Sequence, residues 1–549
     1  MSKAGSSASW REQLSPVGIA IGCVGCVIIT ASSVYTALKM GALPWPTIFT
    51  SITALFLLRA FGHRSLNEAN VTQIVMSAGS MVAGGLAFTI PGIWMLGLSD
   101  SVSWVDMLFV ALSGTLLGLV CTALIRRKFV DESDLEYPIG TAAAETLLAT
   151  KTGGDTGRRL FGSMGIAGLW CVARDALGII PSMVLQLPIP GVSFGIYNSP
   201  MLLSVGFLVG GIGVAFWFAG AVVGNFGLIV GGTTVGLWDT ATAQGIVSSL
   251  GMGLMMGSGV GVVLKDILPK AAEVLRGRGS RSGEGGSRSR FDAGVLALMV
   301  AAAALLACIG LGFGPLVAVV VVLLSFVTTI MSAQSVGQTG IDPMEIFGLI
   351  VLLAVAVFSD VSQVQLFFVA GVVAVACGLA GDVMSDFKTG AIIGTSPRAM
   401  WVGQAIGALL GTVIAVAVLT TLASAYGTDA FGPGKLFVSA QASVVATMVS
   451  GIPSVPAFAL GLVAGIALYF LGLPAMMFGL GVYLPFYMSF SAALGALVKL
   501  AYDRICKARG VDRSSSSEQG ILVASGVLGG ESIVGVVIAL VSVVSGLAG

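Results

Sequence analysis

The stretch PVGIAIGCVGCVIITASSVYTAL, from Pro16 to Leu38, is mostly apolar and contains no charged residue. A helix needs about 20 apolar residues to cross roughly 30 Å of bilayer hydrocarbon, because each residue adds about 1.5 Å. The stretch is too long for the core of a signal peptide and has no obvious cleavage site. It therefore predicts a first membrane span that the mature protein retains.

The composition of the whole chain has the same character. Of 549 residues, 56% are hydrophobic and 10% are charged, and the mean hydropathy is +0.99, whereas soluble domains contain about 25% charged residues. The net charge of +1 gives no overall field that would favour nucleic acid. The 7 cysteines lie almost entirely in apolar runs and predict no disulfide framework. These features exclude a soluble protein and predict no nucleic-acid partner.

Apolar runs recur along the chain and predict an all-α, polytopic integral membrane protein with roughly 14 to 17 spans, some of them broken or re-entrant. Gly253, Gly257 and Gly261 recur on one face of a predicted helix and favour close helix packing. The runs begin near Pro16, Trp45, Val71, Trp104, Phe161, Pro200, Asn225, Ala241, Phe291, Gly312, Met344, Val364, Met400, Lys435, Pro456, Pro474 and Gln519.

The basic residues predict the topology. They cluster in residues 125–129, 151–159, 265–290 and 499–513, whereas residues 96–106 and 185–200 contain no Lys or Arg. The positive-inside rule assigns the basic clusters to the cytoplasm and the other two linkers to the outside. We therefore expect a multi-pass protein of the plasma or inner membrane with a cytoplasmic N-terminus.

One long polar break divides the chain. Residues 265–292 contain GRGSRSGEGGSRSR, whose composition cannot form a buried core. We interpret the break as a flexible basic cytoplasmic linker between an N-terminal transmembrane half, 1–264, and a C-terminal half, 293–549. Binding of anionic lipid headgroups is the alternative to a simple solvated connector.

An ionisable pair, Arg174 and Asp175, lies within a predicted helix in GLWCVARDALGII. Charged groups inside a membrane are costly and often functional. One of the pair could bind a substrate carboxylate or carry a proton, or the two could form a structural ion pair with neighbouring helices.

Two polar, glycine-containing segments interrupt the apolar sequence: DLEYPIGTAAAETLLAT (134–150) and GDVMSDFKTGAIIGTSPR (381–398). Both place an acid before a Gly-Thr pair, and the second contains Asp382 and Asp386. Interrupted segments at matching positions of two halves indicate a transporter's binding site. Two polar loops between helices are the alternative interpretation.

Several further residues are candidates. Glu68 and Asn70 lie at a helix entry, where Glu68 could simply favour the positive helix N-terminus. Asp342 and Glu345 lie in GQTGIDPMEIFG, and Tyr483 lies in GLGVYLPFY.

No motif predicts enzymatic chemistry. The sequence lacks the nucleotide-binding motif GxxxxGK[ST] and therefore gives no support for nucleotide hydrolysis. It lacks HExxH and contains 1 histidine, so it gives no support for metal-centred hydrolysis either. It also has too few Asp and Lys clusters for a membrane pyrophosphatase. We expect no enzyme, no catalytic residue, no metal site and no cofactor.

Several stretches, in order, resemble the oligopeptide transporter (OPT) family, which includes the yellow stripe-like metal-chelate transporters. Residues 12–53 (EQLSPVG…IFTSIT) and 67–97 (NEANVTQ…GIWMLG) resemble the opening of that family. DLEYPIGTAAAETLLAT is similar to its fPxGtAxAExL segment, and SDFKTGAIIGTSPR is similar to its DlKtGyllGatPr segment. GLGVYLPFYMSF resembles its late GxyLp segment. Short termini and loops are typical of a prokaryotic member.

The resemblance implies about 16 spans in two duplicated halves and secondary active uptake coupled to H⁺. It implies short oligopeptides or related small zwitterions as substrates, with metal chelates as the alternative. A passive channel or a membrane enzyme is the alternative of a different class. The expected partners are a small-molecule substrate and the lipid bilayer. The sequence leaves open whether the protein forms a homo-oligomer. The candidate substrate and proton pathway comprises Glu68, Asn70, Tyr137, Gly140, Thr141, Glu145, Arg174, Asp175, Asp382, Asp386, Lys388, Gly394, Arg398 and Tyr483.

Overall fold

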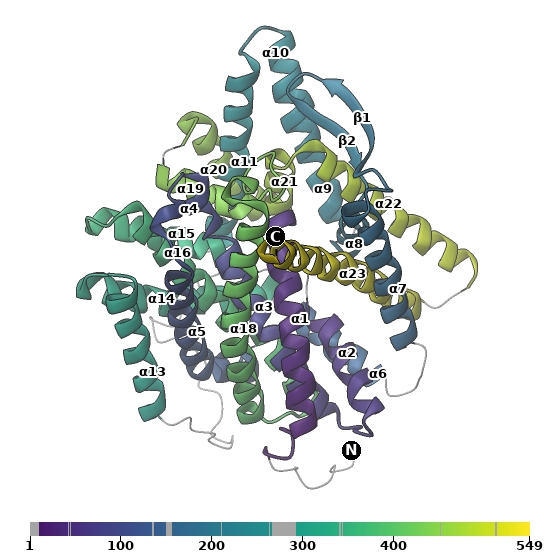
Figure 1. The fold of residues 1–549 in the computed structure, drawn as a ribbon, viewed down its shortest axis with the longest axis vertical. Coiled ribbons are helices and arrows are strands. Elements are labelled where there is room, and N and C mark those ends of the chain that lie inside the picture. The colour runs from purple at the N-terminus through teal and green to yellow at the C-terminus, as the bar shows by residue number, and fades with distance from the viewer. Residues whose placement is uncertain are drawn as a thin grey trace.

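The computed structural model describes residues 10–41, 43, 46–133, 135, 137–149, 156–209, 211–262, 264–265, 293–339, 342, 344–450, 452–510 and 513–548. Across these residues the chain is helical apart from one two-stranded hairpin and an isolated bridge, Phe431 to Phe437 (Figure 1). The predicted all-α membrane fold is confirmed. The predicted linker, apart from Lys265, lies outside the described residues.

The elements follow one another in this order: α1 (Pro16–Met40), α2 (Pro46–Ala60), α3 (Leu66–Ala87), α4 (Pro91–Met95), η1 (Ser99–Ser101), α5 (Trp104–Arg126), η2 (Arg127–Asp131), α6 (Pro138–Ala149), α7 (Thr156–Cys171), η4 (Val172–Ala176), β1 (Met183–Ile189), β2 (Val192–Tyr197), α8 (Pro200–Val209), α9 (Gly211–Ala221), η5 (Val222–Gly231), α10 (Gly232–Thr234), α11 (Thr240–Val262), α13 (Ala293–Leu305), η7 (Leu306–Gly310), α14 (Pro315–Thr339), α15 (Met344–Phe358), α16 (Gln363–Gly381), α17 (Val383–Ile393), α18 (Pro397–Tyr426), η8 (Thr428–Ala430), α19 (Ala440–Ser450), α20 (Val455–Phe470), α21 (Ala475–Tyr483), α22 (Phe486–Ala508) and α23 (Arg513–Ala548).

Length and composition identify many of these helices as membrane spans. In the described part of the chain, 7 segments are long and apolar enough to cross a bilayer: Pro16–Lys39, Leu66–Met95, Trp104–Asp131, Gly211–Thr234, Pro315–Gly337, Gln363–Ile393 and Pro397–Tyr426. Shorter apolar helices of 10–17 residues accompany them. The total number of spans stays a prediction.

Helix α1 shows how the sequence sets the limits of a span. The Ser15 hydroxyl accepts a hydrogen bond from the backbone N–H of Gly18, and Pro16 occupies the first turn. Both features favour a helix start. Gly41 ends the helix with φ 65°, a left-handed conformation that glycine adopts without a steric cost.

Helix α3 lies at the centre of the bundle and packs against α1, α16 and α18. Every residue from Glu68 to Ala87 is buried. Polar side chains on α3 therefore cannot reach water at the protein surface and must find partners on neighbouring helices. This burial positions the candidate site described below.

The predicted glycine face packs helix on helix. A Cβ atom on Gly253 would lie 2.2 Å from the Phe458 carbonyl oxygen, and one on Gly257 would lie 2.2 Å from that of Leu462. Helices α11 and α20 can approach this closely only because these positions lack side chains. The predicted packing role of these glycines is confirmed.

One predicted boundary is wrong. The helix expected to begin near Asn225 is part of the continuous segment Gly211–Thr234, in which the Asn225 amide donates to the Ala221 carbonyl at 3.0 Å. The basic cluster 499–513 is helical as far as Ala508 in α22.

The hairpin was not expected. Strands β1 and β2 pair antiparallel across Pro190 and Gly191, where Gly191 has φ 77°. The alternation of Val192 and Phe194 with polar or small residues is a strand pattern, but the segment is short. Figure 1 shows the hairpin at the top of the bundle and the N-terminus at the bottom. We call these the hairpin end and the N-terminal end.

Candidate functional site

The two interrupted segments meet in the structure, although about half the chain separates them. Helix α6 from the first segment packs against α17 from the second. A Cβ atom on Gly140 would lie 2.1 Å from the Ser385 carbonyl oxygen. The Thr389 hydroxyl donates to the Gly140 carbonyl at 2.8 Å. The absence of a side chain at Gly140 therefore allows backbone contact between the two segments.

Gly140→Ala is expected to lower the free energy of unfolding by about 1–3 kcal/mol, because the new methyl group must push apart two packed backbones. Thermal unfolding of the purified protein measures the change. Gly162→Ala in α7 is the control, since a Cβ atom there meets nothing within 4 Å. Equal melting temperatures for the two variants would contradict the close packing.

Lys388 on α17 makes a further contact with the segment that leads into α6. Its ammonium group donates to the Leu135 carbonyl at 2.9 Å and lies 6.0 Å from the centroid of the Tyr137 ring. Tyr137 has φ 46° and donates through its hydroxyl to the Ala333 carbonyl at 3.3 Å. The entry to α6 is thus held in an uncommon backbone conformation by contacts with α14 and α17.

Asp386 on α17 is surrounded by donors. Its carboxylate accepts hydrogen bonds from the hydroxyls of Thr47 at 2.9 Å and Ser77 at 2.8 Å, and from the amide of Gln73 at 2.8 Å. An ionised carboxylate is an acceptor only, so three donors match its charged form. The sequence singled out Asp386 but not its partners, which lie on α2 and α3.

Further carboxyl groups lie around Asp382. Asp342, Glu345 and Asp386 all interact electrostatically with Asp382. Glu345 is buried. Both carboxylate oxygens of Asp342 are buried, and among the described residues the Ser332 hydroxyl is near this carboxyl group without forming a hydrogen bond of ordinary geometry. These acids and Asp386 form what we call the acid cluster: Asp342, Glu345, Asp382 and Asp386.

Arg174 and Asp175 lie in a different place, near the hairpin. The Arg174 guanidinium donates to both carboxylate oxygens of Asp175 at 2.6 Å, to Glu531 at 2.8 Å and to the Asn198 carbonyl at 2.6 Å. Its side chain is 0% exposed. Of the two alternatives for this pair, the contacts support the structural ion pair.

Glu531 completes this ion-pair network and was missed by the sequence reasoning. Besides Arg174, its carboxylate accepts from the Ser199 hydroxyl at 2.9 Å and from the Met201 backbone N–H at 2.8 Å. It therefore connects α23 to η4 and to the start of α8. Its position as an acid within an apolar run was the available signal.

Other predicted residues lie toward the N-terminal end. Glu68 pairs with His63 at 2.8 Å and accepts from the Ser15 hydroxyl. The Asn70 amide contacts Thr395 at 3.5 Å, while its carbonyl oxygen has no partner in the described part of the chain. The Arg398 guanidinium lies 4.6 Å from the centroid of a Trp10 ring.

The remaining candidates are scattered. Gly394 ends α17 with φ 86°. The Thr141 backbone N–H donates to the Tyr137 carbonyl at 2.9 Å, within the first turn of α6. The side chain of Glu145 lies outside the described part of the structure. Tyr483 ends α21, and its Cβ lies against Gly251 of α11.

The α6–α17 contact therefore places Asp386 and Lys388 on one buried helix within a bundle of apolar helices. The profile of the family described as OPT oligopeptide transporter protein matches residues 13–268 and 291–542. A Haemophilus influenzae protein named "Putative oligopeptide transporter" is 25% identical over 92% of this chain and 92% of its own length. A "Probable metal-nicotianamine transporter" of Oryza sativa subsp. japonica is 23% identical over 83% of this chain and 79% of its own length.

Proposed function

This chain belongs to the OPT oligopeptide transporter family, and from that premise we propose that it is a proton-coupled symporter of short oligopeptides or related small zwitterions. It is a multi-pass membrane transporter and not an enzyme. The coupling ion, the substrate and the direction of transport are the parts that we propose. The mechanism would be alternating access around a site at the α6–α17 contact.

The buried carboxyl group of Asp342, which has no cationic partner among the described residues, carries the proposal of proton coupling. Burying a charge without a partner costs several kcal/mol, whereas a protonated carboxyl group avoids most of that cost. Neighbouring acids add repulsion between like charges. Asp342 would therefore take up a proton in one conformation and lose it in another, in which water or a cation reaches it.

The mixed charge around α17 supports a zwitterionic substrate. A peptide presents an ammonium group and a carboxylate, and each needs a partner of the opposite sign. Lys388 and Asp382 lie on either side of Asp386 on one short stretch of helix. Asp386 is already held by three donors, so Lys388 and Asp382 would contact the substrate.

The second candidate substrate class is a metal chelate. It is favoured by the plant relatives, whose printed names describe metal-nicotianamine transporters. Such a ligand carries carboxylates and amines like those of a peptide, so the same charged groups could serve. The metal would arrive already chelated, as part of the substrate.

We also propose that the N-terminal end faces the cytoplasm of a cell bounded by this plasma membrane. Arg398 lies over the Trp10 ring of the N-terminal segment, and Glu68 contacts both His63 and Ser15. Arg126 lies 5.8 Å from the ring of Phe387. The hairpin segment contains no Lys or Arg. This asymmetry matches the positive-inside rule.

Uptake of labelled trialanine into proteoliposomes tests the function. We expect saturable accumulation with an inward proton gradient and its collapse on adding a protonophore. A parallel arm uses the labelled nickel complex of nicotianamine. Gradient-independent, non-saturating flux would identify a channel instead. Folded protein that accumulates neither probe under a proton gradient would refute the proposal.

A further inference from the structure

A cavity of about 530 Å³ lies under the hairpin, away from the α6–α17 contact. It is lined by residues of β1 and β2 and by Tyr487 of α22. The volume falls within the range of about 300–1,000 Å³ typical of small-molecule pockets. Among the described residues no charged side chain lines it, so a charged ligand would be recognised there through neutral groups.

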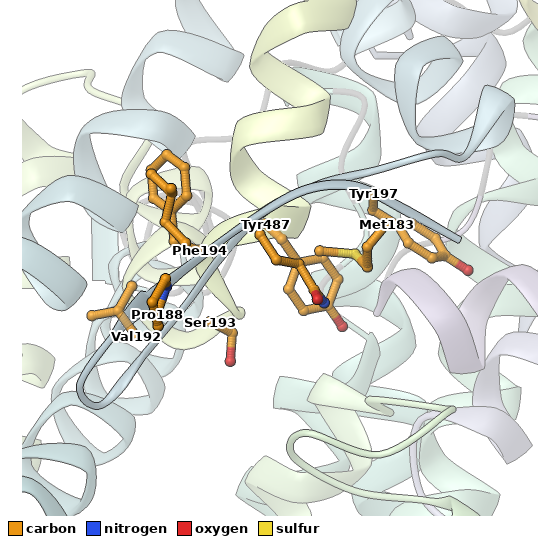
Figure 2. A pocket seen from close by; sticks show the side chains of 9 residues that line it. Met183, Pro188, Val192, Ser193, Phe194, Tyr197 and Tyr487 are labelled. Carbon is orange, nitrogen blue, oxygen red and sulfur yellow. The ribbon is translucent and has the colours of Figure 1, made fainter. Parts of the chain in front are cut away.

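The hydroxyl groups of this cavity are spread along the hairpin. Figure 2 shows Ser193 near one end, Tyr487 in the middle and the Tyr197 hydroxyl at the other end, pointing away from Tyr487. The rings of Tyr197 and Tyr487 lie 5.9 Å apart, centroid to centroid. The backbone N–H of Tyr197 donates to the Ser491 hydroxyl at 2.9 Å and fixes the end of β2 against α22.

A buried cation lies behind Tyr197. The Lys39 ammonium donates to the Tyr197 hydroxyl at 3.4 Å, and the Lys39 residue is 8% exposed. It also lies 5.7 Å from the Tyr35 ring and 5.8 Å from the Phe437 ring. Among the residues that the structure describes, Lys39 forms no ion pair within 4.0 Å.

The nearby acids do not neutralise Lys39 by contact. Asp175 and Glu531 act on it only at longer range, because both are bound directly to Arg174. The buried Lys39 ammonium group has three donors, but among the described residues it has one weak hydrogen-bond acceptor besides the faces of three aromatic rings, so its hydrogen bonding is incomplete. An anion near Tyr197 would therefore lower the energy of Lys39 as well.

The direction of the hydrogen bond determines what Tyr197 can bind. Its hydroxyl oxygen accepts from Lys39, so its own proton is free to be donated. No acceptor for that proton occurs in the described part of the chain. A cation on the accepting side polarises the hydroxyl and strengthens it as a donor. A strong donor at the edge of an otherwise neutral cavity selects an acceptor that carries negative charge.

We propose that this cavity is a carboxylate-recognition subsite, in which Tyr197, polarised by Lys39, donates a hydrogen bond to a carboxylate of the transported substrate. The inference rests on the proposed transport function and extends it to a position at the hairpin end. Both a peptide C-terminus and an aminocarboxylate chelate present this group. Tyr197 is the contact residue and Lys39 is a positioning residue.

Calorimetric titration of the full-length protein in nanodiscs tests the subsite with three probes: trialanine, trialanine amide and the nickel complex of nicotianamine. Tyr197→Phe keeps the ring and removes the hydroxyl. Loss of a charge-assisted hydrogen bond should weaken binding of a carboxylate probe by about tenfold or more. Binding of trialanine amide should change by less than about twofold, because its terminal group is neutral.

Tyr502→Phe is the matched control. It makes the same chemical change on α22, about 20 Å along the helix from Tyr487, and should leave all three affinities unchanged. Lys39→Met should produce the same selective loss as Tyr197→Phe. If Lys39→Met does not fold, Tyr197→Phe decides the question alone. The carboxylate probe that the wild-type protein binds identifies the source of the carboxylate.

The outcomes separate the two proposals. Wild-type protein that binds a probe, with Tyr197→Phe weakening acid and amide equally or neither, overturns the subsite and leaves the transport function standing. Wild-type protein that neither binds nor accumulates any probe overturns both. A loss confined to carboxylate probes in Tyr197→Phe, with Tyr502→Phe unchanged, supports the subsite.

Discussion

Asp342→Asn is expected to abolish proton-driven accumulation of substrate while leaving exchange of labelled for unlabelled substrate intact. Asn has nearly the shape of a protonated Asp but cannot release a proton. The carboxyl group of Asp342 is buried among neutral groups that include the Ser332 hydroxyl, so a neutral amide avoids the cost of burying a charge there. The variant should therefore behave as if position 342 were permanently protonated. It should still carry substrate across the membrane in exchange, but the proton gradient should no longer drive accumulation.

The measurement compares accumulation with exchange in the same proteoliposome preparation. Asp360→Asn makes the same chemical change at an exposed position between α15 and α16 and should retain accumulation. Accumulation by Asp342→Asn equal to that of the wild type would show that Asp342 does not carry the coupled proton. Loss of both accumulation and exchange, with a normal melting temperature, would instead show that Asp342 is needed for substrate movement itself.

Glu531→Ala is expected to lower the free energy of unfolding by about 3–5 kcal/mol, the usual cost of removing one partner from a buried ion pair. Glu531 accepts hydrogen bonds from Arg174, Ser199 and the Met201 backbone. Its removal leaves donors unsatisfied in η4, at Ser199 and in the first turn of α8. Asp175 still contacts Arg174, but one carboxylate cannot replace the contacts made by the other.

Denaturant-induced unfolding of purified protein measures this loss. Glu132→Ala is the matched control, because Glu132 pairs with Arg127 at 2.7 Å while the two side chains are 48% and 61% exposed. Exposed pairs contribute about 1 kcal/mol or less. If both variants lost the same stability, the Arg174 network would be no more important than a surface pair.

The sequence predicted the class of protein well because the relevant properties are local. A window of about 20 apolar residues is enough to predict a span, and the stretch from Pro16 to Leu38 became most of α1. The glycine repeat at Gly253 and Gly257 likewise needs only helical periodicity. The segments 134–150 and 381–398 were singled out from their composition alone, and they contact each other in the structure.

The sequence failed where a residue's role depends on a distant partner. Neither Lys39 nor Glu531 was singled out. Each acquires significance only through contacts far along the chain, with Tyr197 for Lys39 and with Arg174 for Glu531. The hairpin was missed because its short strands lie in a segment whose lack of basic residues predicted only an outside loop.

The amino-acid sequence by itself therefore determined that this chain is a polytopic helical membrane protein of the OPT family. Hydropathy, periodicity and family motifs depend only on residues that are close together in the sequence. Only the tertiary structure decided which polar groups meet. Asp386 accepts hydrogen bonds of ordinary geometry from Gln73 and Ser77, whereas Asp342 accepts none from the described residues. Inside a membrane bundle water cannot form hydrogen bonds with such groups. Helix packing therefore determines which of them have hydrogen-bond partners and which do not.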